Sequence, residues 1–310
     1  MTDRPNAGRW VAALVGITFV WGATFVVVKE AVDRLPVLVF NAWRFTIAAA
    51  VLAVFARRQL AELGRDGFRR GVVLGLALGG GYALQTFGLT GTTASKAGFV
   101  TGTFVVFTPL LQAALLRRAP RPMALAAVGV AAAGLALLSL RGSLVPSVGD
   151  ALVLGCAFLF ALHIVGLGAW STHHPPAALA TVQLATTAVL HIVATGIEAL
   201  VRSDGYAVMP PDAFVWSSLL FTAVFASALA FTVQTAAQRV LSPTRAAVIM
   251  TMEPVFSWLT AWLGVPLLVA LGVTGFAREV FGGREALGAG LILVAMLLTE
   301  LRGPRAADVV

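Results

Sequence analysis

The feature that most constrains this chain is a series of long, uninterrupted apolar runs. A bilayer core of ~30 Å needs roughly 20 helical residues to cross it. Runs of this size alternate with short segments that carry charges and turn formers, and they cover residues 10–28, 37–56, 71–90, 98–116, 122–140, 150–170, 177–199, 213–236, 245–264 and 285–301. They lack the apolar–polar alternation of a β-barrel. The sequence therefore predicts an all-α polytopic membrane protein with ten transmembrane helices.

The composition excludes the common soluble classes. Hydrophobic residues make up 59% of the chain and charged residues 12%, whereas a soluble domain has ~45–50% and ~25%. Because Cys156 is the single cysteine, an intrachain disulfide scaffold is excluded. We attribute the net charge of +8 to basic loops of a membrane protein. The basic residues are divided among many loops, so we expect no nucleic-acid partner.

The distribution of basic residues predicts the orientation. With the N-terminus inside, fourteen arginines fall on inner segments, seven basic residues fall on outer segments, and Arg44 lies within a span. This bias matches the positive-inside rule. The tails, residues 1–9 and 303–310, are then both cytoplasmic. The excess of arginine over lysine and the alanine content are typical of a GC-rich bacterial genome, so we expect a bacterial inner (plasma) membrane.

An internal repeat divides the chain into two halves. Gln85-Thr86 recurs as Gln234-Thr235, 149 residues later, and Thr108-Pro109 is echoed by Glu253-Pro254. These matches predict five-helix repeats over residues 10–141 and 149–302. Five is an odd number, so the second repeat must cross the membrane in the opposite sense. Inverted repeats are typical of secondary transporters, which bind substrate near the membrane midplane between the halves.

Several motifs resemble one transporter family. They are Trp21-Gly22-Ala23-Thr24-Phe25 in the first span, Phe107-Thr108-Pro109-Leu110 in the fourth and Glu253-Pro254-Val255-Phe256 in the ninth. In this order and spacing they resemble the EamA-type family of the drug/metabolite transporter superfamily, over about residues 10–302. The resemblance implies a ten-helix inner-membrane carrier, in many members an exporter of amino acids, related metabolites or toxic compounds.

The second repeat is longer than the first. Pro109 and Arg141 are 32 residues apart, whereas Pro254 and Arg302 are 48 apart. The extra residues fall near 264–283, and Pro266, Gly272 and Gly275 indicate a helix break there. We expect a short helix or turn on the outer surface, or a re-entrant segment. It either shapes the outer mouth or is tolerated loop growth.

Two charged residues inside spans are the first candidates for substrate contact, because such charges are costly in a bilayer and usually face a cavity or a partner. Glu253 precedes Pro254 and could bind a substrate ammonium or exchange a proton; the alternative is a structural pair with Arg44. Arg44 could hold a substrate carboxylate, or it could reach outward to the membrane interface.

Polar and aromatic residues extend the candidate site. Gln85 and Gln234 occupy equivalent repeat positions and could bind a polar substrate or only join helices. Tyr82 and Phe231 are also equivalent, and Trp21 lies in the first span; such aromatics line a cavity or face lipid. His163 is a second candidate for proton coupling, with a structural hydrogen bond as the alternative. His191 is a further intramembrane histidine.

Other chemistries lack a signature in the sequence. Neither His163 nor His191 has a metal-ligand partner at helical spacing, so we expect no metal and no cofactor. Gly79-Gly80-Gly81 lacks the lysine and hydroxyl of a phosphate loop, and the chain has no ATPase motif or nucleophile elbow. We therefore expect a secondary carrier, not an enzyme, with a small-molecule substrate and the lipid bilayer as partners, either monomeric or homodimeric. A membrane-embedded enzyme acting on lipid-linked substrates and a non-transporting sensor remain the alternatives.

Overall fold

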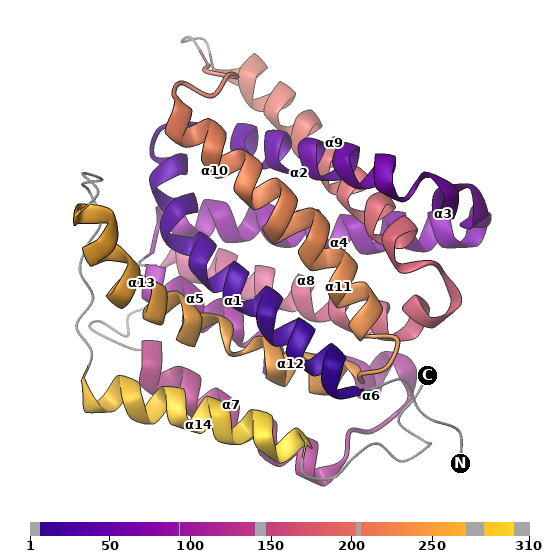
Figure 1. The fold of residues 1–310 in the computed structure, drawn as a ribbon, viewed down its shortest axis with the longest axis vertical. Coiled ribbons are helices and arrows are strands. Elements are labelled where there is room, and N and C mark those ends of the chain that lie inside the picture. The colour runs from indigo at the N-terminus through magenta and orange to yellow at the C-terminus, as the bar shows by residue number, and fades with distance from the viewer. Residues whose placement is uncertain (1–6, 93, 140–146, 203–205, 271–281, 301–310) are drawn as a thin grey trace.

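The computed structural model describes residues 7–92, 94–139, 147–202, 206–270 and 282–300. Every regular element in these ranges is helical (Figure 1). The first half comprises α1 (Ala7–Val32), α2 (Val37–Phe55), α3 (Arg57–Glu62), α4 (Gly64–Thr90), α5 (Ala94–Gly102), α6 (Phe104–Leu116) and α7 (Pro122–Ser139). The second half comprises α8 (Val148–Trp170), η1 (Ser171–His173), α9 (Pro176–Val201), α10 (Ala213–Ala223), η2 (Val224–Leu229), α11 (Ala230–Ala237), α12 (Pro243–Met250), α13 (Glu253–Ala270) and α14 (Gly283–Glu300).

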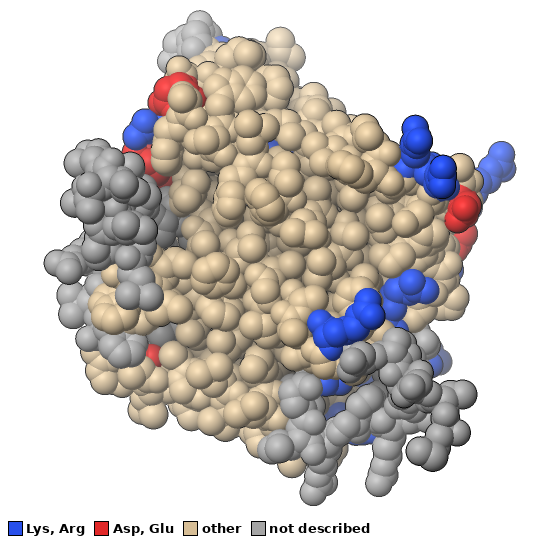
Figure 2. Space-filling view, in the orientation of Figure 1, with Lys and Arg blue, Asp and Glu red and all other residues tan. Residues whose placement is uncertain are grey.

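Each of the ten predicted spans coincides with one helix or with consecutive helical pieces. Six helical stretches of the described residues are long and apolar enough to cross a membrane, and Val100–Leu116 and Pro122–Leu137 are shorter apolar helices. Figure 2 shows a broad face without charged side chains, with Lys, Arg, Asp and Glu gathered towards its edges. This distribution fits a protein whose flank is solvated by lipid. The prediction of an all-α polytopic membrane fold is confirmed.

Local sequence signals explain where several helices begin. Ser147 and Asp150 form a capping box at the start of α8, and the Asp212 carboxylate accepts a hydrogen bond from the Val215 N–H at the start of α10. Pro243 stands in the first turn of α12, directly after the capping Ser242. The capping side chains accept from backbone donors that a helix leaves free at its N-terminus, and Pro243 has no N–H that would need a partner.

The helix pairing is related between the two halves. α4 packs on α8 and α9, and its repeat counterpart, the continuous run α10–η2–α11, packs on α1 and α2. α1 packs on α13, as α8 packs on α5 and α6. α7 and α14, the last helices of the two halves, lie side by side at one edge of the bundle (Figure 1). The halves therefore interlock as two five-helix repeats would.

Two predicted spans are interrupted near their middle. The fourth span changes from α5 to α6 at Thr103, and the ninth changes from α12 to α13 at Thr251 and Met252. α13 runs through Pro266 and ends at Ala270, and residues 271–281 of the region where a break is expected lie outside the described residues. A proline inside a membrane helix is tolerated when neighbouring groups satisfy the freed carbonyl. Gly272 and Gly275 lie outside the described residues.

Candidate functional site

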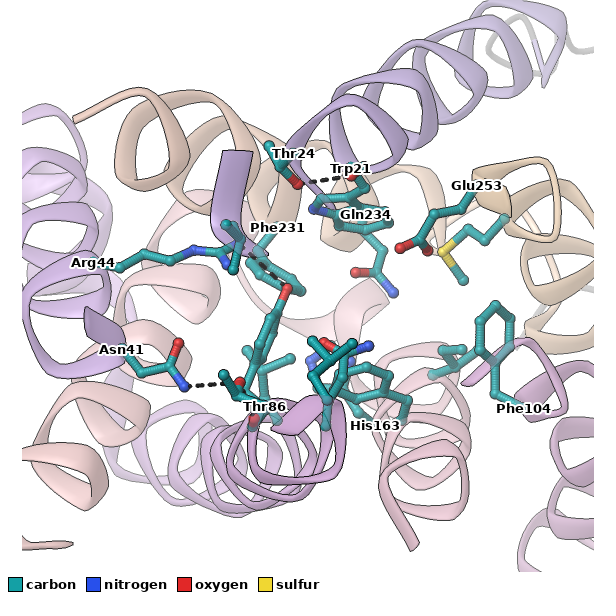
Figure 3. Close-up of a pocket in the computed structure, with 18 residues that line it drawn as sticks. Trp21, Thr24, Asn41, Arg44, Thr86, Phe104, His163, Phe231, Gln234 and Glu253 are labelled. Atoms are coloured by element: carbon teal, nitrogen blue, oxygen red, sulfur yellow. Dashed lines mark hydrogen bonds between the residues drawn. The ribbon is translucent and has the colours of Figure 1, made fainter. Parts of the chain in front are cut away.

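A cavity at the centre of the bundle is lined by both halves of the chain (Figure 3). Counted out to its open mouth, it contains about 800 Å³ of empty space. Its lining combines apolar walls with a few polar groups. The lining residues are Trp21, Thr24, Val28, Asn41, Arg44, Leu78, Tyr82, Gln85, Thr86, Leu89, Phe104, Phe160, His163, Ile164, Phe231, Gln234, Met250 and Glu253.

Arg44 is held at this cavity by neutral groups. Its Nε donates to Ser227 Oγ at 2.8 Å, and Nη2 lies 3.4 Å from the Ala226 carbonyl oxygen and 3.5 Å from the Tyr82 hydroxyl. The guanidinium also stacks over the Tyr82 ring at 5.0 Å. The side chain is 4% exposed, so it does not extend to the membrane interface. A buried guanidinium with only neutral partners is suited to receive an anionic group of a ligand.

The π-helical turn η2 supplies the acceptors for this arrangement. The Ala226 carbonyl oxygen also accepts the Trp21 indole N–H, at 2.8 Å. A π-turn changes the regular backbone pairing of an α-helix and is frequent at functional sites. Through η2, side chains from α1 and α2 converge on one point of the second half. This turn has no signal in the sequence, because Val224–Leu229 consists of ordinary apolar and small residues.

Glu253 begins α13, directly after the break in the ninth span. Its carboxylate points into the cavity (Figure 3). The ion pairs found among the described residues include none between Glu253 and Arg44. The alternative that these residues form a structural salt bridge is therefore not what the structure contains. The two opposite charges instead line one cavity, on helices from different halves.

Both repeat-equivalent glutamines reach the same cavity. Gln85 lies on α4 and donates to Thr101 Oγ1 at 3.2 Å. Gln234 lies on α11 and donates from Nε2 to Gln238 Oε1 at 3.3 Å. Gln85 thus joins two helices and also lines the cavity, whereas Gln234 lines the cavity and bonds only the residue that caps its own helix.

The two intramembrane histidines have different surroundings. His163 lines the cavity, and its Nε2 lies 2.7 Å from Gln183 Oε1. His191 is fully buried, its Nδ1 bonds the Thr187 carbonyl oxygen at 2.8 Å, and it is not among the lining residues. His163 is therefore the histidine placed to meet a ligand.

The aromatic candidates pack on one another around the cavity. Trp21 contacts Phe231 with ring centroids 5.6 Å apart, and Tyr82 contacts Phe231 at 6.3 Å. The repeat equivalence of Tyr82 and Phe231 thus corresponds to direct contact across the two halves.

Sequence reasoning missed Asn41 as a lining residue. Asn41 stands one helical turn before Arg44, and it donates to Thr86 Oγ1 at 3.1 Å; the three-residue spacing was a usable signal. Phe104 precedes Glu253 by 149 residues, the repeat offset, and both line the cavity. No cluster of three or more His, Cys, Asp or Glu residues suited to a metal ion occurs in the described ranges.

Comparisons with known proteins agree with this architecture. The model of the EamA-like transporter family matches residues 8–140. A protein of Archaeoglobus fulgidus, named only as an uncharacterized transporter, is 32% identical over 92% of this chain and 84% of its own length. The uncharacterized transporter YoaV of Bacillus subtilis is 24% identical over 32% of this chain and 35% of its own.

One solved crystal structure shows the same fold. It is 18% identical in sequence, with a TM-score of 0.72 over 94% of this chain and 96% of that chain. Together with the helical architecture, the similarity to the archaeal relative over nearly the whole chain identifies this protein as a multi-pass membrane protein of the EamA-like transporter family.

Proposed function

We propose that this protein is a secondary transporter that exports small organic metabolites, with amino acids and related compounds as the first substrates to test and drugs as a further class. The observation that carries the proposal is the unpaired placement of Arg44 and Glu253 at one central cavity. A zwitterion offers a carboxylate to the guanidinium and an ammonium to the carboxylate. Apolar and aromatic walls leave room for its side chain.

The proposed mechanism is alternating access between two repeats, residues 10–141 and 149–302. Val28, Asn41 and Leu89 line the cavity near helix ends that face outward in the proposed orientation, with both termini in the cytoplasm of a bacterial cell. On the other side of the cavity, Gln112 Oε1 on α6 accepts from Thr244 Oγ1 at 2.9 Å at the start of α12. These features fit an outward-open state in which the α6–α12 contact closes the inner side.

The test is efflux from proteoliposomes loaded with a panel of labelled amino acids, amines and organic acids. We expect at least one compound to leave faster than from protein-free liposomes, with loss of that flux in Arg44→Gln and Glu253→Gln. Glu62→Gln, which makes the same chemical change on the exposed helix α3, is the matched control and should keep the flux. No flux for any compound, together with no ligand-dependent rise in Tm, would contradict the proposal.

A further inference from the structure

Two short hydrogen-bond chains fix the orientation of polar atoms at the cavity. The first ends on a backbone carbonyl of α9: Gln183 Nε2 donates to the Leu179 carbonyl oxygen at 3.1 Å. A carbonyl oxygen can only accept, so the amide nitrogen of Gln183 must face it. The Gln183 Oε1 then faces His163 Nε2 at 2.7 Å and must accept from it. His163 therefore carries its proton on Nε2, and in the neutral ring Nδ1 is a bare acceptor.

The second chain repeats this logic on another helix. Gln238 Nε2 donates to the Ile164 carbonyl oxygen at 2.7 Å, which directs Gln238 Oε1 to accept from Gln234 Nε2. The other amide atom, Gln234 Oε1, is then an acceptor that is buried and has no hydrogen-bond partner among the described residues. A buried amide oxygen without a partner costs free energy, and this one belongs to a side chain that lines the cavity.

Both chains therefore leave an acceptor on a side chain that lines the same cavity as Glu253. His163 is next in sequence to Ile164, whose carbonyl oxygen accepts from Gln238. The His163 ring also lies 6.0 Å from the ring of Phe231, which stands one helical turn before Gln234. Figure 3 shows the Gln234 amide and the Glu253 carboxylate directed into the cavity. The strong donor of the cavity, Arg44, is bound elsewhere, to Ser227 and Ala226 of η2. The lining is thus divided into an acceptor side and a donor side.

We propose that Glu253, Gln234 Oε1 and His163 Nδ1 form a subsite for a primary ammonium group, and that Gln183 and Gln238 are its positioning residues. A primary ammonium carries three N–H donors, equal to the number of acceptors, and it compensates the Glu253 charge. A tertiary ammonium has one N–H and a quaternary ammonium has none. This inference rests on the proposed transport function and sharpens its substrate class to primary amines and α-amino acids.

The first experiment measures binding to the purified full-length protein in nanodiscs. The probes are L-leucine, L-phenylalanine and 2-phenylethylamine, each with its N,N-dimethyl and N,N,N-trimethyl forms. Calorimetry measures the affinity for each probe. We expect each methylated form to bind at least about ten-fold more weakly than its primary amine, the equivalent of one well-made charged hydrogen bond. Equal binding of primary and trimethyl forms would overturn the subsite.

The positioning role is tested by Gln183→Glu. The new carboxylate still accepts from His163 Nε2 but favours the imidazolium, which places a proton on Nδ1 and turns an acceptor into a donor. We expect affinity for primary amines to fall about ten-fold at neutral pH and to recover as the pH rises. The substitution leaves in place the other titratable lining groups, Arg44, Tyr82 and Glu253, and the buried Cys156 on α8. A pH-independent loss would indicate a structural role and count against the proposal.

Two further variants keep the test decisive. Gln59→Glu makes the same change on the exposed helix α3 and should leave affinity unchanged. If Gln183→Glu does not fold, Gln234→Met removes the unpartnered oxygen and should abolish most of the discrimination against trimethyl forms. Binding of 3-phenylpropionate without binding of any amine would overturn the subsite alone. Binding of no compound would count against both the subsite and the transporter proposal.

Discussion

Two equivalent helices of the repeats, α4 and the run α10–η2–α11, solve the same packing problem differently. α4 is a regular α-helix from Gly64 to Thr90. At Gly75 its backbone is so close to α9 that an added Cβ would lie 2.6 Å from the Gln183 carbonyl oxygen. The equivalent place in the second repeat, 149 residues later, is Val224, the first residue of η2. One repeat uses glycine for close approach, and the other uses a π-turn.

The difference separates a packing surface from a ligand-facing one. The glycine face of α4 brings backbones together, and its Gly75 carbonyl accepts from Thr187 Oγ1 of α9 at 3.1 Å. The π-turn instead exposes the Ala226 carbonyl to Trp21 and Arg44. The two repeats therefore share topology while only the second supplies acceptors for the buried guanidinium. We infer that the asymmetry at this position orients the cavity, with its donor at η2 and its acceptors on α8, α11 and α13.

The largest expected effect is a loss of stability when the close packing of the α4 glycine face is disturbed. In Gly75→Val the new side chain must displace the α9 backbone, and we expect a loss of about 3 kcal/mol of stability, in the range for overpacked cores. The measurement is the Tm and denaturant midpoint in nanodiscs. Gly196→Ala on α9, where an added Cβ meets nothing within 4 Å, is the control. An unchanged Tm in Gly75→Val would refute the role of close approach.

A smaller effect is expected at the ligand-facing side. Ser227→Ala removes the acceptor of Arg44 Nε, and hydrogen bonds to charged groups contribute about 2 kcal/mol. We expect carboxylate-bearing compounds to bind at least about ten-fold more weakly and their decarboxylated amines to bind nearly as before. Ser217→Ala, which removes an exposed hydroxyl bonded within its own helix, should change neither. Equal weakening of acids and amines would show that Ser227 does not act through Arg44.

The third variant tests the other partner of the π-turn. Trp21→Phe keeps an aromatic ring against Phe231 and deletes the indole N–H donated to the Ala226 carbonyl. Because the carbonyl still has Arg44 nearby, we expect a loss of only about 1 kcal/mol, the usual contribution of a neutral hydrogen bond. Thermal unfolding would measure it. A loss as large as that of Gly75→Val would mean that the π-turn, and not the glycine face, limits stability.

The smallest effect concerns how the two helices begin. α4 starts without a side-chain cap, whereas Asp212 caps α10 and lies 3.2 Å from Arg34. The Val215 N–H hydrogen bond, followed by Arg34, lowers the pKa of Asp212. A carboxyl whose pKa is lowered in the folded state stabilises the fold at pH values above the ordinary carboxyl pKa. This stabilisation disappears as the pH falls through the lowered pKa.

The corresponding measurement compares wild type with Asp212→Asn between pH 7 and pH 3. We expect wild type to have a slightly higher Tm at neutral pH and the difference to vanish at the acid end, because asparagine still caps a helix but forms no ion pair. A difference that grows on acidification would contradict the assigned sign. The site is exposed, so added salt should also reduce the difference.

Some residues of the site could be predicted from the sequence, and others could not. Arg44 and Glu253 were predicted because a charge within an apolar run is costly wherever the helix lies. Gln85 and Gln234 were predicted from the repeat, and both line the cavity. Ser227 was missed, because a serine among alanines carries no signal until Arg44 is known to approach it from 183 positions away in the chain. The break expected near residues 264–283 stays a prediction, because α13 ends at Ala270 and residues 271–281 lie outside the described ranges.

The sequence by itself determined that this protein is an all-α membrane protein, and it predicted ten spans and two five-helix repeats. These follow from hydropathy, loop charge and repeat spacing, which are local or periodic properties of the chain. The tertiary structure alone decided that Arg44 and Glu253 remain unpaired, that η2 departs from α-helical geometry, and which atoms of Gln234 and His163 serve as acceptors. Those outcomes depend on distances between helices far apart in sequence, and hydrogen-bond direction is set only when a specific carbonyl lies within reach.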